Sequence, residues 1–208
     1  MNSLFSLTPP FILASQSPRR RRLLEQLETS FTVEVSPAEE RLETDPAPKE
    51  RARQLATRKA VPVAERHPGA LVLAADTIVI HDGAVLGKPA SPAEAQQMLR
   101  RLSDTTHTVY TGLALHHTAS DRQVTAGRAT QVTFRALSSA EIEAYVATGS
   151  PMDKAGAYGI QDHTGPLLVD DLHGDYYNVV GLPLEVLYST LHAHFADLMT
   201  VPDASQPD

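Results

Sequence analysis

Hydrophobic positions recur along the chain at two spacings, which predict strands interspersed with helices. The longest apolar run, LVLAADTIVI at residues 71–80, predicts a buried central strand. Residues 49–65 place alanine, leucine and valine at helical spacing and predict a helix, in which Pro62 is expected to cause a kink. The sequence His81-Asp82-Gly83 follows the central strand and predicts a hairpin turn.

Shorter patterns mark the remaining elements. Further strands are predicted at residues 11–14, 31–35, 84–86, 106–116, 123–134 and 167–172. Further helices are predicted to start after Ser17, Ser91, Ser138 and Pro183. The second and third of these starts carry capping boxes, because a glutamate follows each serine after three residues. Residues after 200 are expected to be a disordered tail.

Composition narrows the possible classes of protein. A chain of 208 residues can form one domain or two closely packed lobes. Because it contains no cysteine, disulfides and thiolate chemistry are excluded, which fits a cytoplasmic location. The formal charge of −7 argues against a nucleic-acid partner. The first residues lack the features of a secretory signal. No apolar run is long enough to span a membrane, so no membrane partner is expected.

A run of arginines at residues 19–22 creates an electrostatic problem. Ser17 and Pro18 predict a helix that begins here, so the arginines lie in its opening turns. A helix N-terminus is already partly positive, and cations there are unfavourable unless an anion binds. A strand, a turn and a helix start meet at this point, which is the usual geometry of a phosphate site. The alternative is a solvated helix face on which Arg21 and Glu25 form an ion pair.

A carboxylate, Asp76, interrupts the longest apolar run. A buried carboxylate is unfavourable unless it is paired, hydrogen bonded or bound to a metal. Asp76 is therefore either a structural residue held by backbone N–H groups at a strand end, or a general base or metal ligand at the mouth of a sheet. Thr77, the next residue, is expected to point to the opposite face of the strand.

Several other polar residues lie where a site could use them. Lys59 lies on the apolar side of its predicted helix, and Lys88 follows the hairpin in a rigid Gly-Lys-Pro sequence. Many such lysines simply extend to solvent. Ser15 and Ser17 flank the turn before the arginines, where their hydroxyls can donate to a phosphate. Glu40 lies in an acidic loop, a place where carboxylates are usually solvated.

Five motifs occur in a specific order between about residues 11 and 188. They are LASQSPRR, AADTIV, LGKP, MDKAGAYGIQ and NVVGLPL. Together they resemble the motifs of the Maf family of nucleoside-triphosphate pyrophosphatases. The combination of AADT with DKAGAYGIQ resembles the branch that acts on dTTP and UTP, whereas the branch that acts on 7-methyl-GTP differs at both places.

The resemblance implies an α/β fold of the two-lobed Maf/ITPase-like kind, with helices flanking a central mixed sheet and a cleft between the lobes. It implies a single Maf-like domain over residues 1–199 and a homodimer. It also implies an enzyme that hydrolyses nucleoside triphosphates to a monophosphate and pyrophosphate with a divalent metal, magnesium or manganese. Family members have been associated with nucleotide house-cleaning and with arrest of cell division.

The resemblance also implies roles for individual residues. Asp76 corresponds to the catalytic base and, with Glu40, to the metal ligands. The residues that correspond to the substrate-binding positions are Ser15, Ser17, Arg19, Arg20, Lys59, Thr77, Lys88 and Gln161. Among these, Arg19, Thr77 and Gln161 match positions linked to the choice of substrate.

Two departures from the family pattern leave questions. Asp162 stands where the family usually has glycine, next to Gln161, and residues 36–43 fit the acidic pattern around Glu40 only loosely. A second interpretation also remains, namely a regulatory protein that senses a nucleotide in the same pocket without turnover. Asp76 separates the two, because an enzyme needs a base in this strand and a sensor does not.

Overall fold

The apolar run at the centre of the chain forms β4 (Leu71–His81), a strand inside a mixed sheet. The structure is a computed structural model that describes residues 4–39, 42 and 46–201. Within these residues the sheet has seven strands, in the order β3 (Thr32–Val33), β2 (Phe11–Leu13), β4, β6 (Thr106–His117), β7 (Arg122–Phe134) and β8 (Val169–His173), with β5 (Ala84–Leu86) paired to β4. The β2–β3 and β2–β4 pairs are parallel and the other pairs are antiparallel, so the mixed sheet is confirmed.

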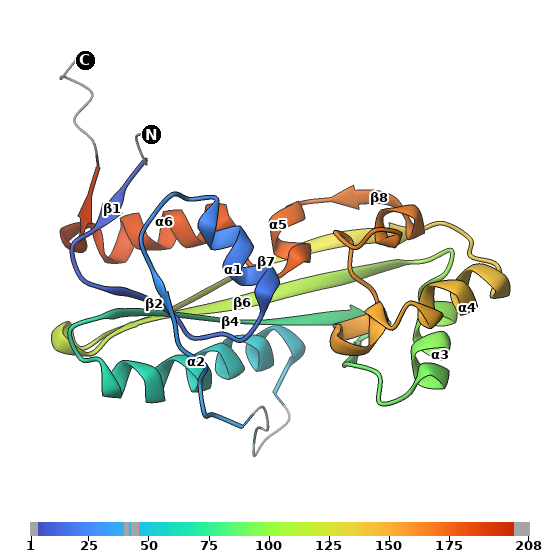
Figure 1. Cartoon of the computed structure of the whole chain (residues 1–208), viewed down its shortest axis with the longest axis horizontal. Coiled ribbons are helices and arrows are strands. Elements are labelled where there is room, and N and C mark those ends of the chain that lie inside the picture. Colours follow the sequence, from blue (N-terminus) through green and yellow to red (C-terminus); the bar gives the residue numbers. More distant parts are fainter. Residues whose placement is uncertain (1–3, 40–41, 43–45, 202–208) are drawn as a thin grey trace, which may run out of the picture.

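Three long strands run through two lobes (Figure 1). These strands are β4, β6 (Thr106–His117) and β7 (Arg122–Phe134). At one end α2 (Pro48–Arg66) covers one face, while α1 (Pro18–Glu25) and α6 (Leu184–His194) cover the other. At the other end lie α3 (Pro92–Leu102), α4 (Ser139–Ala147) and β8 (Val169–His173). The two-lobed α/β fold expected from the motifs is therefore present.

The packing of α2 on the sheet depends on small residues. Ala52, Ala56, Ala60 and Ala64 recur every four residues and are fully buried. Gly112 on β6 lies directly beneath the helix, because a Cβ atom there would come within 2.8 Å of the backbone of Ala52. Helix and sheet therefore approach closely, and the helix continues through Pro62 as one element. This close approach brings one side of α2 next to β4.

The predicted local signals mostly hold. The hairpin forms between β4 and β5 (Ala84–Leu86), with Asp82 and Gly83 both at positive φ, as its turn type requires. The capping box at Ser138 is complete. The box at Ser91 forms only in part, since the Ser91 side chain caps α3 while Glu94 bonds the backbone N–H of Ala90 instead.

Several elements differ from the predictions. The strand expected at residues 31–35 shortens to β3 (Thr32–Val33), and β2 covers Phe11–Leu13. Three short elements were not predicted: β1 (Ser6–Leu7), α5 (Tyr176–Val180) and β9 (Met199–Thr200). β1 pairs with β9, so the two ends of the described chain lie together. The predicted tail falls mainly on residues 202–208, outside the described residues.

No helix in the described part of the chain is long and apolar enough to cross a membrane.

The lobe that contains α3, α4 and β8, called the outer lobe below, contains a buried histidine. His107 on β6 packs edge-on against the rings of Phe134 and Tyr158, with centroids 5.1 and 5.3 Å away. Its Nε2 lies 2.8 Å from the Tyr158 hydroxyl. Burial, assisted by neighbouring His81, lowers the pKa of His107 to about 4. The fold therefore holds this imidazole in its neutral form.

This burial predicts a pH dependence of stability. The folded-state pKa of His107 lies below its ordinary value of 6.5, so the unfolded chain binds more protons between these two values. The stabilisation is complete above about pH 6.5 and is lost as the pH falls towards 4. His107→Gln keeps a polar group near Tyr158 but does not titrate. From pH 7.5 to pH 5 the wild type should lose about 2 kcal/mol more unfolding free energy than the variant. Urea titrations at both pH values measure this, and equal losses would contradict it.

Candidate active site

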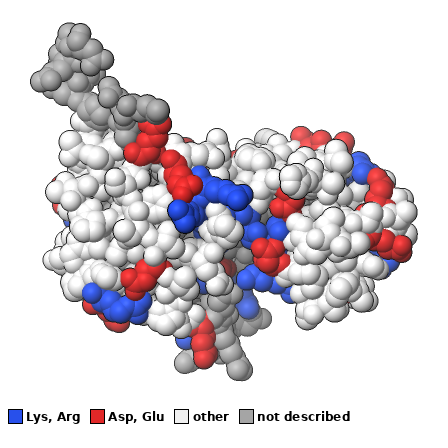
Figure 2. Space-filling view, in the orientation of Figure 1, with Lys and Arg blue, Asp and Glu red and all other residues white. Residues whose placement is uncertain are grey.

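A cleft of about 760 Å³ opens between the two lobes. Figure 2 shows that lysine and arginine side chains gather at the hollow in the middle of this face, although the chain as a whole is acidic. The cations that line the cleft are Arg19, Arg20, Arg51, Lys59, Lys88 and Lys154. Such a concentration of positive charge in a concave site attracts an anion.

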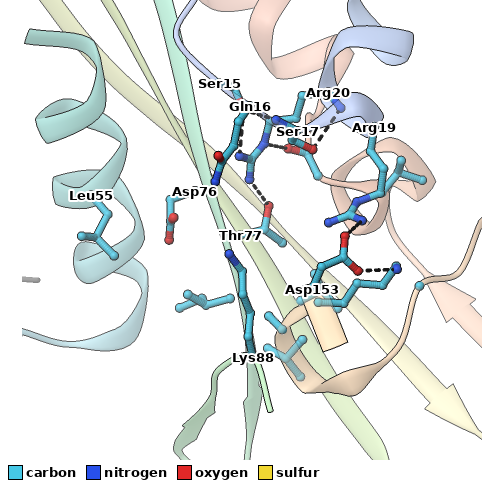
Figure 3. A pocket seen from close by; sticks show the side chains of 18 of the residues that line it. Ser15, Gln16, Ser17, Arg19, Arg20, Leu55, Asp76, Thr77, Lys88 and Asp153 are labelled. Atoms are coloured by element: carbon cyan, nitrogen blue, oxygen red, sulfur yellow. Dashed lines mark hydrogen bonds and ion pairs between the residues drawn. The ribbon is translucent and has the colours of Figure 1, made fainter. Parts of the chain in front are cut away.

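The cleft brings together the residues singled out in the sequence. It is lined by Ser15, Ser17, Arg19, Arg20, Lys59, Asp76, Thr77, Lys88 and Gln161, and several of these are shown in Figure 3. They come from the turn before α1 and from α1 itself, from α2 and β4, from the segment after β5, and from the loop that carries Gln161. Glu40, the remaining candidate, lies outside the described residues.

Arg20 is tied to three separate segments. Its Nε donates to the carbonyl of Gly181 at 2.8 Å, and its Nη2 donates to the Thr77 hydroxyl at 3.1 Å. Its Nη1 contacts Ser15 Oγ at 3.4 Å, while Ser17 Oγ caps the Arg20 backbone N–H. Arg20 therefore joins the start of α1 to β4 and to the end of α5.

Thr77 is held from its other side as well. Its hydroxyl lies 2.9 Å from that of Thr111, which in turn donates to the carbonyl of Asn178 at 2.9 Å. The Asn178 side chain is fully buried and accepts from the Thr111 N–H. This network fixes the Thr77 hydroxyl, so Arg20 meets a rigid partner at the cleft wall.

Arg19 extends across the cleft to the opposite lobe. Its Nη1 donates to Asp153 Oδ2 at 3.0 Å, and Lys154 Nζ donates to the other oxygen of Asp153 at 2.7 Å (Figure 3). Burial raises the pKa of Asp153, but the hydrogen bonds from Lys154 and Arg19 outweigh burial and hold it below its ordinary value. The Asp153 carboxylate is therefore ionised and is shared by two cations.

Asp76 and Lys59 form the central pair of the cleft. Lys59 Nζ on α2 donates to Asp76 Oδ1 on β4 at 2.6 Å, and their side chains are only 12% and 13% exposed. The carboxylate is thus stabilised by a cation from a neighbouring helix, which excludes the interpretation that backbone N–H groups alone hold it. Thr77 contacts Arg20 on the side away from α2, as the alternation of the strand predicts (Figure 3).

Three charged cleft residues were missed in the sequence: Arg51, Asp153 and Lys154. Arg51 precedes Leu55 and Lys59 by four and eight residues, so the three share one face of α2, and that spacing could have revealed it. The other two belong to the motif MDKAGAYGIQ, but the 3₁₀ turns that place them in the cleft have no clear sequence pattern.

The cleft also offers oxygen ligands of the kind that magnesium prefers. The described residues contain no group of three or more His, Cys, Asp or Glu side chains placed to hold a metal by themselves. Asp76 and Asp153 nevertheless line the cleft. Magnesium is commonly bound by one or two carboxylates together with the phosphates of a substrate. The carboxylates of this cleft therefore fit a metal that is also held by substrate phosphates.

Comparison with known proteins identifies the class to which this cleft belongs. Residues 10–194 match the family model described as Maf-like protein. This match spans most of the chain, and the chain therefore belongs to the Maf family.

Three curated relatives share the name dTTP/UTP pyrophosphatase. A dTTP/UTP pyrophosphatase of Salinibacter ruber is 58% identical over 98% of this chain and the whole of that protein. A dTTP/UTP pyrophosphatase of Halalkalibacterium halodurans is 51% identical over 89% of this chain and 96% of its own. A third, from Symbiobacterium thermophilum, is 53% identical over 83% of this chain and 88% of its own.

The contacts of Arg20 generate a prediction about stability. The helix-dipole argument alone suggests that removal of a cation from the start of α1 leaves stability unchanged or slightly higher. Arg20→Ala instead leaves the Gly181 carbonyl and the Thr77 hydroxyl without their donor, at a cost of about 1–3 kcal/mol. Because 1 kcal/mol shifts the Tm of a chain of this size by about 2–4 °C, Tm should fall by several degrees.

Arg21→Ala is the matched control, because Arg21 is exposed and pairs only with Glu25 among the described residues. Its Tm should stay within about 2 °C of the wild type. Thermal unfolding of both variants without nucleotide measures the difference. Equal Tm values would mean that the hydrogen bonds of Arg20 do not stabilise the fold.

Proposed function

We propose that the protein hydrolyses dTTP and UTP at the bond between the α and β phosphates, releasing a nucleoside monophosphate and pyrophosphate. The observation that carries this proposal is the Asp76–Lys59 pair at 2.6 Å in a cleft lined by further cations. The relatives named dTTP/UTP pyrophosphatase, at 46–58% identity, support the same class of reaction. The chain is accordingly a hydrolase that acts on the phosphoric anhydrides of nucleoside triphosphates.

The charge of the cleft suits a triphosphate. Such a substrate carries about four negative charges, and attack by water is slow unless these are neutralised. Arg19 on α1 and Lys88 after β5 both line the cleft, and the N-terminus of α1 adds a partial positive charge. The arginine run at this helix start is therefore interpreted as part of a polyphosphate site.

Asp76 is the proposed general base. It is placed at the cleft wall, where its carboxylate can accept a proton from the attacking water. Lys59 holds the carboxylate in position through its hydrogen bond to Oδ1. Lys59 and Asp76 thus keep a negative group inside a positively charged cleft, next to the anionic substrate.

A divalent metal, magnesium or manganese, completes the proposal. Members of this family generally need such an ion, and Asp76 and Glu40 are the ligands that we propose. When bound, the ion neutralises phosphate charge and polarises the bond to be cleaved. The side chains of the protein hold the Asp76 carboxylate in position and bind the remaining phosphate charge.

Gln161 is proposed to recognise the base. Uracil and thymine present a carbonyl next to an N–H group, and a glutamine amide offers a donor and an acceptor that match both. Cytosine presents the reverse order, which the amide can satisfy only by flipping. Gln161 lines the cleft together with Tyr158 and Gly159.

The remaining parts of the proposal concern the setting of the protein. We propose a cytoplasmic homodimer without nucleic-acid or membrane partners, with a house-cleaning or cell-division role that depends on hydrolysis. The alternative is a regulatory protein that senses nucleotide in the same cleft, and it differs from the enzyme in showing no turnover.

The products test the proposal directly. The protein is incubated with dTTP, UTP, CTP, ATP or GTP and magnesium or manganese, and products are identified by ³¹P NMR and anion-exchange chromatography. dTTP should give dTMP and pyrophosphate in equal amounts, with dTTP and UTP preferred over the other three. First products of dTDP and orthophosphate would contradict cleavage at the α–β bond. Nucleotide binding without any product would favour the sensor.

A further inference from the structure

The loop that carries Gln161 turns back on itself very tightly. A Cβ atom on Gly165 would meet the carbonyl oxygen of Gly159, and one on Gly159 would come within 2.7 Å of Asp162 Oδ2. The backbone N–H of Asp162 donates to the Gly159 carbonyl at 3.1 Å, and that of Gly165 donates to the Asp162 carbonyl at 3.2 Å. Gln161 therefore lies inside a turn in which the next residue, Asp162, is bonded through both its backbone groups.

The Asp162 side chain fastens this turn to the rest of the outer lobe. Its Oδ2 accepts hydrogen bonds from Ser150 Oγ and from the Tyr145 hydroxyl, and lies 3.3 Å from Lys154 Nζ. The side chain is 18% exposed. Burial raises the pKa of Tyr145 to about 12, so its hydroxyl remains a donor at neutral pH. One carboxylate thus gathers two hydroxyls and a cation from two other segments.

These partners are themselves fixed. Lys154 is buried, and its Nζ also donates to the Ser150 carbonyl at 2.6 Å and to Asp153. Tyr145 on α4 accepts from the Gly159 N–H at 3.0 Å, so it holds both ends of the turn. Through Asp153, the same set of contacts reaches Arg19 at the start of α1. The turn is therefore anchored to α4 and linked across the cleft to the arginine helix.

Anchoring matters because a glutamine amide distinguishes bases only when its orientation is fixed. If the loop moves, the amide can flip and satisfy cytosine as well as uracil. Asp162, the residue next to Gln161, is held in place by the contacts of its carboxylate with Tyr145, Ser150 and Lys154. We propose that Asp162 is a positioning residue that fixes the Gln161 loop and thereby sets the preference for uracil and thymine over cytosine. This inference rests on the proposed function.

A merely structural role predicts something different. If Asp162 only stabilised the fold, its loss would lower activity towards every nucleotide by the same factor. If it positions Gln161, its loss changes the ratio of kcat/KM for UTP to that for CTP. A fixed site leaves a polar group unpaired opposite cytosine, at about 1–3 kcal/mol, which corresponds to roughly tenfold or more in that ratio.

The test compares kcat/KM for dTTP, UTP and CTP in the wild type, Asp162→Ala, Asp162→Asn, Gln161→Ala and the double Ala variant. Asp162→Ala should lower the UTP/CTP ratio by roughly tenfold, towards that of Gln161→Ala. The double variant should show no further loss, because both residues act on one interaction. Asp162→Asn keeps the shape of the side chain and tests the role if the alanine variant does not fold. Asp171→Asn, an exposed residue on β8, is the control and should keep the wild-type ratio.

The outcomes separate this inference from the proposed function. A wild type that prefers UTP, together with Asp162 variants that keep the wild-type ratio, would overturn the inference alone. An equal decrease for all three nucleotides would also overturn it, because that is the result of a structural role. A wild type without any preference between UTP and CTP would overturn the proposed base choice and this inference together.

Discussion

The ion pair between Lys59 and Asp76 is the interaction on which the cleft depends. A carboxylate in the central strand of a sheet is unfavourable unless a partner compensates it, and Lys59 Nζ does so at 2.6 Å. Lys59 can reach Asp76 because α2 lies close to the sheet. The buried face of the helix is rich in alanine, and it packs over Gly112. Small residues on the buried side of α2 thus allow a polar pair at its edge, and the pair places a carboxylate among cations.

The two leading arginines of α1 solve the electrostatic problem of their helix in different ways. The guanidinium of Arg20 is hydrogen bonded within the fold, because it donates to the carbonyl of Gly181 and to two hydroxyls. Arg19 instead pairs with Asp153 across the cleft, a contact that an incoming phosphate can replace. Arg20 helps to build the cleft, whereas Arg19 connects its two sides.

Much of the fold and the site could be predicted from the sequence, because their signals are local. The apolar run of β4, the turn at Asp82-Gly83 and the capping box at Ser138 each depend on neighbouring residues. Asp76 and Lys59 could be selected because each is a charge on an apolar face. The motifs then placed them in one cleft, as the structure does.

The missed features depend on contacts between distant residues. α5 is only five residues long. The side chain of its buried Asn178 forms hydrogen bonds with β6, and no local sequence pattern predicts these contacts. In the same way, the contacts of Asp162 with Tyr145 and Ser150 span 17 and 12 residues across irregular turns. Glu40 lies outside the described residues, so its role stays a prediction.

The central claim is that Asp76 performs chemistry and does not merely complete an ion pair. The most direct test measures turnover of dTTP by Asp76→Asn, together with the Kd of a dUTP analogue that has a methylene bridge between its α and β phosphates. The amide keeps the shape of the side chain, so binding should stay within a few fold of the wild type. Turnover should fall by about 10²-fold or more, as expected on loss of a general base. A purified variant with near-normal turnover would show that Asp76 is structural and would contradict this account.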